Sequence, residues 1–301
     1  MTTVQSTPPT STVPTARPAL EAPRRRPRRR NNPVFWLVMV LLTLVILAPL
    51  VYMLLTSIKS TVEARSVPPT LFPTEPSLKA FRTLFFSDEA SPVLRWLLNS
   101  VVAATLHSLL VVVICSMAGY ALARMEFPFK KAIFGLIIAT LFLPGFIFMM
   151  PNFEILNRLN WLDTIWAIVV PGAAGAFGVF FMRQFFSTIP MALEESARID
   201  GASSWRIFRS IILPNSRPAI VTLAVISFLA NWNDFVFPIY VLFSAERLTL
   251  PVGLTKLQGS YTIDYPVIMA GAALASVPVL LLYIFVQRYI IEGVASSGIK
   301  G

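Results

Sequence analysis

One charged segment has the residue types and spacing of a recognition element. It covers residues 187–218 and reads STIPMALEESARIDGASSWRIFRSIILPNSRP. The sequence predicts a short helix, a sharp turn at Gly201 and a second short helix, because glycine adopts the left-handed conformation at little cost. Ser203 or Ser204 is expected to cap the second helix. Acidic and basic residues alternate on the polar side of this element: Glu194, Glu195, Arg198, Asp200, Arg206 and Arg209.

Two interpretations of this segment differ in what its apolar side contacts. Apolar residues recur at spacings of three and four, which predicts one apolar face made of Trp205, Phe208, Ile211 and Ile212. An amphipathic helix lying on lipid would have the same face. That interpretation leaves the acids against a membrane leaflet that repels them. A protein partner accounts for both features, so we favour a docking surface.

A second polar cluster interrupts an apolar stretch and consists of Asn231, Trp232, Asn233 and Asp234. A carboxylate within the membrane is a functional candidate, because its burial is costly unless the group is hydrated or paired. Asparagine and aspartate can form hydrogen bonds with sugar hydroxyls, and a tryptophan offers a flat face. The four residues are therefore candidates for a substrate path. The alternative is that they form hydrogen bonds between helices.

The chain contains few residues suited to disulfide, metal-binding or ATP-hydrolysing chemistry. The chain contains one cysteine, Cys115, and one histidine, His107. These counts exclude a disulfide framework and a multi-thiolate metal site, and we predict no metal site. The chain also contains no G-x-x-x-x-G-K-[ST] segment, so it is not expected to hydrolyse ATP or to be an enzyme.

The elements that position these residues are predicted to be membrane helices. The chain has 301 residues, of which 55% are hydrophobic and 13% charged, and its mean hydropathy is +0.70. A soluble domain has about 25% charged residues. This chain cannot cover a surface that faces water, which excludes most classes of soluble enzyme.

The predicted fold is all-α, with six transmembrane helices. Each helix needs about 20 mostly apolar residues. Six segments qualify: Val34–Ile58, Trp96–Leu122, Ala132–Met150, Thr164–Met182, Ala219–Phe243 and Pro266–Val286. With both termini in the cytoplasm, the cytoplasmic segments contain 17 lysines and arginines and the outer segments contain 8, as the positive-inside rule requires. Prolines lie within or beside five of the segments, either for packing or as bending points: Pro49, Pro144, Pro171, Pro238 and Pro278.

Residues 1–33 are predicted to form a disordered, Arg- and Pro-rich cytoplasmic tail, and residues 34–301 the membrane domain. The first 30 residues contain seven arginines and one acidic residue, and they lack the apolar side chains needed to fold. The arginine run adjoins an apolar segment, which favours an anchor at the lipid surface over a nucleic-acid-binding patch.

The charged segment resembles a known signature. Glu195-Ser196-Ala197, Asp200-Gly201-Ala202, Phe208 and Leu213-Pro214 are similar to the EAA motif of permease subunits of bacterial ABC importers, with Ser196 where alanine is usual. The stretch Asn231–Phe235 with Pro238 resembles the W-N-x-F…P stretch of the carbohydrate-uptake branch. The ending Arg288-Tyr289…Gly298-Ile299-Lys300-Gly301 resembles that of the same branch, although an Ala-Val pair usually precedes K-G. The resemblance covers residues 95–301, roughly.

The resemblance implies the type I transmembrane fold of ABC importers and a permease subunit that moves a di- or oligosaccharide across the bacterial cytoplasmic membrane. The implied partners are a second permease, a dimer of ABC ATPases that uses ATP and magnesium, and an extracytoplasmic sugar-binding protein. Neither a bound cofactor nor a nucleic-acid partner is expected. The implied ATPase-coupling residues are Glu194, Glu195, Ser196, Ala197, Asp200, Gly201, Ala202, Phe208 and Pro214.

Two further segments have roles implied by the resemblance. The ending Gly298–Gly301 would reach the ATPase interface. The outer loop Ser244–Tyr265 would face the sugar-binding protein, with Tyr261, Asp264 and Tyr265 as contacts. An ion-coupled secondary transporter is the alternative function. That class usually has ionisable residues mid-membrane and internal repeats, and here Asp234 is the one candidate and no duplication is evident.

Overall fold

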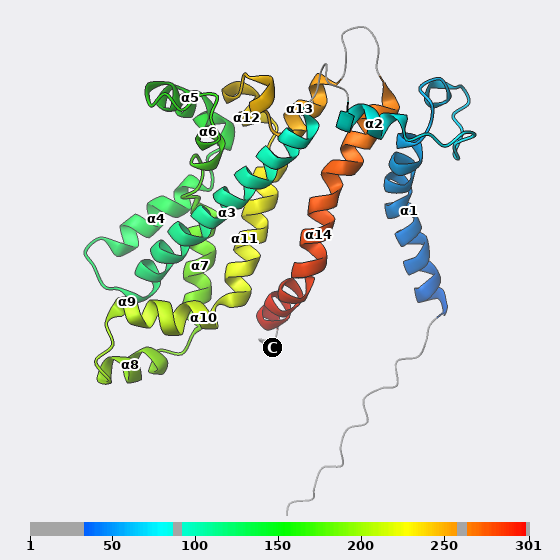
Figure 1. The fold of residues 1–301 in the computed structure, drawn as a ribbon. Helices are drawn as coiled ribbons and strands as arrows, with labels where there is room; N and C mark the ends of the chain where they lie inside the picture. Colours follow the sequence, from blue (N-terminus) through cyan, green and yellow to red (C-terminus); the bar gives the residue numbers. More distant parts are fainter. Residues whose placement is uncertain (1–32, 87–91, 258–263, 299–301) are drawn as a thin grey trace, which may run out of the picture. The chain divides into compact units, whose positions relative to one another are not determined.

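The computed structural model describes residues 33–86, 92–257 and 264–298, with side chains described as far as Gln287. The predicted disordered tail therefore lies outside the described residues, apart from Pro33. The described residues form helices and connecting segments, with no strand among them (Figure 1). The chain divides into a unit of residues 1–47 and a unit of residues 48–301, and the packing below is within the second.

The first half of the described chain contains α1 (Pro33–Ser57), η1 (Glu63–Arg65), α2 (Lys79–Phe86), α3 (Val93–Arg124), α4 (Lys130–Thr140), η2 (Gly145–Phe148), α5 (Met149–Arg158) and α6 (Trp166–Val169). The second half contains α7 (Ala176–Thr188), α8 (Ala192–Ile199), α9 (Ser204–Ile207), η3 (Phe208–Ile212), α10 (Leu213–Asn215), α11 (Arg217–Trp232), α12 (Val236–Val241), η4 (Ala245–Arg247), α13 (Leu250–Lys256) and α14 (Tyr265–Gly298).

Three helices are long and apolar enough to cross a membrane alone: α1, α3 and α14. Three further pairs qualify if each bent pair counts as one span. The bends are 100° between α4 and the η2–α5 segment, 76° between α7 and α8, and 79° between the α9–α10 segment and α11. The described part of the chain thus has three clear spans, or up to six, by length and composition.

The third, fourth and fifth predicted spans differ from continuous helices. In the fifth, α11 ends at Trp232 and α12 begins at Val236. The predicted Ala132–Met150 helix ends at Thr140, shortly before Pro144, and the predicted Thr164–Met182 helix is interrupted between α6 and α7. Pro171 lies in that interruption, and Gly172 adopts a φ of +77°. Proline lacks the N–H that a helix interior needs, and a left-handed residue ends a helix. The breaks in the third and fourth predicted spans therefore have a local cause. Pro49 and Pro278, by contrast, lie inside unbroken helices.

Helix α3 is the centre of the packing. It contacts α7 and α11 along its length, and α11 contacts α14 (Figure 1). Buried side chains form one cluster around Trp96 and Ile168 and a second around Cys115, Met182 and Phe186. Small residues allow α3 and α7 to approach closely, as is common between membrane helices. A Cβ atom on Gly178 would lie 2.6 Å from the sulfur of Cys115.

Replacing Gly119 should loosen this packing. A Cβ atom there would lie 2.8 Å from the Cβ of Met182 and 2.9 Å from the backbone nitrogen of Arg183. Because backbone cannot move aside easily, Gly119→Ala should destabilise the fold by about 1–3 kcal/mol. The measurement is the thermal unfolding midpoint of the purified protein in detergent. Gly135→Ala is the control, since Gly135 lies inside α4 with nothing within 4 Å. Equal midpoints for the two variants would refute the packing argument.

Candidate functional site: a charged helical element and a polar cavity

The charged segment folds into α8, a tight turn and α9, and the turn has the predicted chemistry. Gly201 adopts a φ of +79°. The Gly201 N–H donates to the carbonyl of Arg198 at 3.0 Å, and the Ala202 N–H donates to the carbonyl of Ala197 at 2.9 Å. These two bonds form a Schellman motif, which satisfies carbonyls at the end of α8. The Ser203 hydroxyl accepts the N–H of Arg206 at 3.3 Å, so the predicted cap of the second helix is confirmed.

The solvent-exposed side of the α8–α9 element presents charged side chains together with apolar ones. Ile199 is 87% exposed and Trp205 is 60% exposed. Exposed apolar groups amid charges are typical of protein contact sites. Of the predicted coupling residues, Ala197 and Ala202 are half-buried, and Glu195, Ser196, Asp200, Gly201 and Pro214 are exposed.

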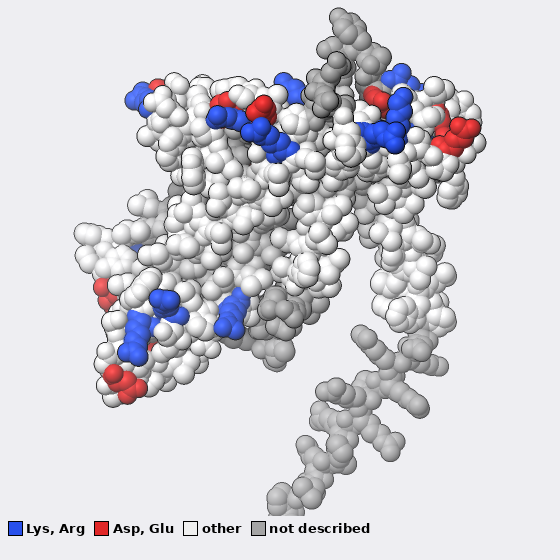
Figure 2. Space-filling model, in the orientation of Figure 1, with Lys and Arg blue, Asp and Glu red and all other residues white. Residues whose placement is uncertain are grey.

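Figure 2 shows where charge lies on one face of the molecule. Over the helices of residues 48–301, charged side chains gather at two ends, with a mostly uncharged band between them (Figure 2). Charges of both signs lie over the end formed by α8 and α9. The α8–α9 element therefore lies at one end of an apolar band.

Two predicted coupling residues face inward, contrary to the sequence interpretation. Glu194 is fully buried, and its carboxylate lies 2.9 Å from Nε of Arg124. Phe208 is 4% exposed, and its ring packs against Tyr120 with centroids 4.9 Å apart. Successive residues of a helix point about 100° apart, so Glu194 and Glu195 face different surroundings. The expectation that both acids lie on the polar side was wrong. Trp205 and Phe208 do share the predicted apolar face, with ring centroids 5.6 Å apart, although Trp205 is largely exposed.

The breaks in three predicted spans meet at one cavity of about 370 Å³. Asp234 contributes a half-buried carboxylate, which accepts the backbone N–H of Phe237 at 3.4 Å. Asn152, on α5, contributes an amide and was not among the residues predicted from the sequence. Its position eight residues after the helix-breaking Pro144 is the sequence feature that could have indicated it. The lining residues come from η2, α5, the break before α7 and the start of α12: Gly145, Phe146, Met149, Asn152, Pro171, Gly172, Asp234, Val236 and Phe237.

The other three residues of the predicted substrate path lie outside this cavity lining. The Asn231 amide donates to the carbonyl of Ile168 at 2.8 Å, so it joins α11 to α6 as the interhelical alternative proposes. Trp232 is buried and stacks on Phe228 with ring centroids 5.8 Å apart. Asn233 is exposed and donates to the carbonyl of Leu229 in its own helix. Asp234 is thus the predicted path residue that lines the cavity.

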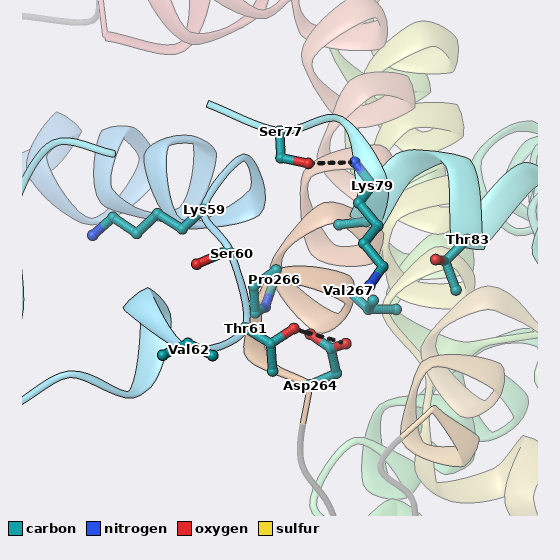
Figure 3. A pocket seen from close by; sticks show the side chains of 11 residues that line it. Lys59, Ser60, Thr61, Val62, Ser77, Lys79, Thr83, Asp264, Pro266 and Val267 are labelled. Atoms are coloured by element: carbon teal, nitrogen blue, oxygen red, sulfur yellow. Dashed lines mark hydrogen bonds between the residues drawn. The ribbon is translucent and has the colours of Figure 1, made fainter. Parts of the chain in front are cut away.

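A smaller cavity of about 220 Å³ lies beside Asp264, one of the residues predicted to contact the binding protein. The Thr61 hydroxyl donates to both carboxylate oxygens of Asp264 at 3.3 Å, and Figure 3 shows these two side chains facing each other. Lys79 extends from α2 into the same region (Figure 3). Tyr265 begins α14 and is 41% exposed. Tyr261 lies outside the described residues.

An ionised aspartate orders the start of the outer loop. Asp163 accepts the N–H groups of Phe243 at 2.9 Å and of Ser244 at 3.0 Å. Burial acts to raise the pKa of Asp163, but hydrogen bonds from the Ser244 hydroxyl and both N–H groups, together with the charge of Arg247, outweigh it. The pKa of Asp163 therefore lies below its ordinary value, and the carboxylate stays charged at neutral pH.

The chain is similar to proteins of one transport family. Residues 111–295 match the family described as binding-protein-dependent transport system inner membrane component. The arabinooligosaccharides transport system permease protein AraQ of Halalkalibacterium halodurans is 32% identical over 91% of this chain and 100% of its own length. The diacetylchitobiose uptake system permease protein NgcG of Streptomyces coelicolor is 32% identical over 90% of this chain and 89% of its own length.

A solved structure has the same fold. It is a bacterial ABC transporter involved in the import of the acidic polysaccharide alginate, with a TM-score of 0.72 and 22% identity over 85% of this chain and 95% of that chain. The matched family and the relatives confirm the family resemblance predicted from the EAA-like segment. The predicted location in the bacterial cytoplasmic membrane is confirmed as well, since the matched family consists of inner-membrane components. This chain belongs to the family of binding-protein-dependent transport system inner membrane components, the permeases of ABC transporters.

Proposed function

We propose that this chain is the permease subunit of an ATP-driven importer and that α8 and α9 form the surface on which a partner ATPase docks. The observation that carries the proposal is the exposed EAA-like element itself. Its acids, Glu195 and Asp200, are available to a partner's arginines, and its Gly201 turn brings the backbone close to the surface. Ser196, Ala197, Ala202 and Pro214 complete this surface, while Glu194 and Phe208 attach it to the helices behind it.

The proposed topology has six spans, with both termini and the docking element in the cytoplasm. The excess of lysine and arginine in the segments placed there supports this topology. The partner ATPases, and not this chain, bind ATP and Mg²⁺ in the proposed assembly. A second permease and an extracytoplasmic binding protein complete it, with Tyr261, Asp264 and Tyr265 as contacts to the binding protein. The ending Gly298–Gly301 lies outside the described side chains and is proposed to reach the ATPase.

The proposed substrate is a carbohydrate, and its path includes the cavity beside Asp234. Relatives named for arabinooligosaccharides and diacetylchitobiose support this substrate class. The cavity pairs a carboxylate and an amide with the rings of Phe146 and Phe237. Carboxylates and amides accept and donate hydrogen bonds to sugar hydroxyls, and rings cover the apolar faces of sugars. An ion-coupled secondary transporter would also use a carboxylate such as Asp234, but it would leave the exposed EAA-like element without a role.

Substitutions at Gly201 should separate backbone strain from side-chain bulk at the docking surface. A Cβ atom added at Gly201 would have nothing within 4 Å, so the left-handed backbone is the constraint. Gly201→Val should distort the turn at about 1–2 kcal/mol and release the ATPase, whereas Gly201→Asn should retain it because asparagine tolerates this conformation. The measurement is co-purification of the ATPase with the tagged permease. Equal recovery of the ATPase with both variants would contradict the docking proposal.

Substitutions in the cavity should weaken sugar uptake without affecting ATPase docking. Hydrogen bonds to charged groups contribute about 1.5–3 kcal/mol, so Asp234→Asn should raise the KM of uptake by roughly tenfold or more. Asn152→Ala should raise it by a smaller factor, because its bond is neutral. The measurement is uptake of labelled arabino- and chito-oligosaccharides by cells that contain the whole importer. Asn157→Ala is the matched control, an exposed asparagine on the same helix. An unchanged KM for Asp234→Asn would remove this cavity from the path.

A further inference from the structure

Arg124 ties the docking element to the helix at the centre of the fold. It is the last residue of α3, and its guanidinium contacts four residues between Phe186, near the end of α7, and Glu194, in α8. Nη2 donates to the carbonyl of Phe186 at 2.6 Å and to that of Ile189, and Nη1 lies 3.2 Å from the sulfur of Met191. Nε lies 2.9 Å from the carboxylate of Glu194. One planar, permanently charged group thus fixes both the bend and the first turn of α8.

The Arg124–Glu194 pair is buried, so its strength depends on both charges. The side chains are 9% and 1% exposed. Among the described residues, Nε of Arg124 has no aligned hydrogen-bond partner, so attraction between charges holds its contact with Glu194. Such attraction is screened little inside a protein. Replacing Glu194 by glutamine would keep the shape of the side chain and remove the charge.

Helix α3 extends from this pair to the opposite end of the fold. It has 32 residues without an internal proline, which corresponds to about 48 Å at about 1.5 Å per residue. The neighbouring segments are bent by 76° to 100°. Because α3 is continuous, a displacement applied at one end reaches the other without being absorbed at a hinge.

The outer end of α3 holds the outer loop through side chains one turn apart. Trp96 Nε1 donates to the carbonyl of Ala245 at 2.6 Å. The Asn99 amide donates to the carbonyls of Glu246 and Leu248, each at 2.9 Å. The Ser100 hydroxyl accepts the N–H of Leu250 at 2.7 Å. Helix α3 is therefore bonded to the docking element at one end and to the loop between α12 and α13 at the other.

We propose that Arg124 is the positioning residue through which movement of α8 is transmitted to α3, and that α3 carries this movement to the outer loop at residues 245–250. The inference rests on the proposed docking of an ATPase at α8. It assigns Glu194 to transmission and leaves Glu195 and Asp200 for contact with the partner.

A separate apolar contact keeps the element folded when the ion pair is removed. Tyr120, Phe186 and Phe208 pack their rings together, with Tyr120 and Phe186 at 6.3 Å and Phe186 and Phe208 at 6.5 Å between centroids. These contacts join α3, α7 and η3 without using a charge. Loss of the ion pair should therefore weaken the transmission of movement more than it weakens folding.

The first test uses the complete importer, purified with its ATPase, second permease and binding protein and reconstituted in liposomes. Glu194→Gln and Arg124→Gln should retain the ATPase on purification. Stimulation of ATP hydrolysis by the sugar-loaded binding protein should fall roughly tenfold or more, within the range of coupling free energies between sites. The exchange Arg124→Glu with Glu194→Arg should restore part of the stimulation. Glu126→Gln is the control, since its ion pair with Lys130 is at the same end but Glu126 is 91% exposed.

The outcomes of this test distinguish the two proposals. A Gly201→Val variant that loses the ATPase, beside a Glu194→Gln variant that retains it and is no longer stimulated, supports both. Full stimulation in the assembled Glu194→Gln complex would overturn the transmission role and leave docking intact. Retention of the ATPase by Gly201→Val would instead overturn docking.

A second measurement leaves Arg124 and Glu194 unchanged. It therefore tests the proposal even if variants at these two residues fail to assemble. In a Cys115→Ser background, spin labels at Leu98→Cys and Leu193→Cys report the distance between the outer end of α3 and α8, since both leucines are exposed. If α8 and α3 move together, this distance should be the same with and without ATP. A change larger than the width of the distance distribution would overturn the proposal.

Discussion

The close approach of α7 to α3 is the contact on which the rest of the structure depends. Two glycines, Gly119 on α3 and Gly178 on α7, allow this approach, because a side chain on either would overlap atoms of the other helix. At that separation the end of α3 reaches the end of α7, and Arg124 can bond to the carbonyls of Phe186 and Ile189. The position of α8 follows from those bonds. A docking element with few buried side chains of its own thereby acquires a defined place on the bundle.

The same bundle uses interrupted helices where the cavity lies. Backbone groups freed at a break need partners, and in an apolar environment they find them only where protein or a hydrated cavity is near. The breaks beside Pro144, Pro171 and Asp234 all contribute to one cavity lining. At the third break the carboxylate of Asp234 accepts the Phe237 N–H near the start of α12. The interruptions and the polar cavity therefore have one physical cause, whereas Pro49 and Pro278 lie in helices that stay intact.

The sequence predicted those features whose causes are local. Gly201 and Ser203 were identified because a left-handed turn and a helix cap depend on a few neighbouring residues. The burial of Glu194 could not be predicted in this way, since its partner, Arg124, is 70 residues away and the helix phase relative to α3 is a tertiary property.

The polar cluster of the fifth predicted span shows the same limit. Asn231, Trp232 and Asp234 are close in the sequence, yet one bonds to another helix, one is in the core and one lines the cavity. Asn152 joins Asp234 only because the chain turns by 100° after α4. Composition and spacing thus located the membrane helices and the docking segment, but tertiary contacts decided which neighbouring residue faces which surface.

The docking element is held by two kinds of contact that constrain different motions. Ring packing among Tyr120, Phe186 and Phe208 fixes the distance of the element from the bundle, but apolar contact is non-directional and permits sliding. The guanidinium of Arg124 has donors in a fixed plane, so its bonds to two carbonyls and its pairing with Glu194 also fix rotation and register. A partner that pushes on Glu195 and Asp200 would therefore move α3 with α8 and would not merely rotate the short helix in place. The two adjacent acids therefore have different roles: Glu194 attaches α8 to α3, and Glu195 is left to bind the partner.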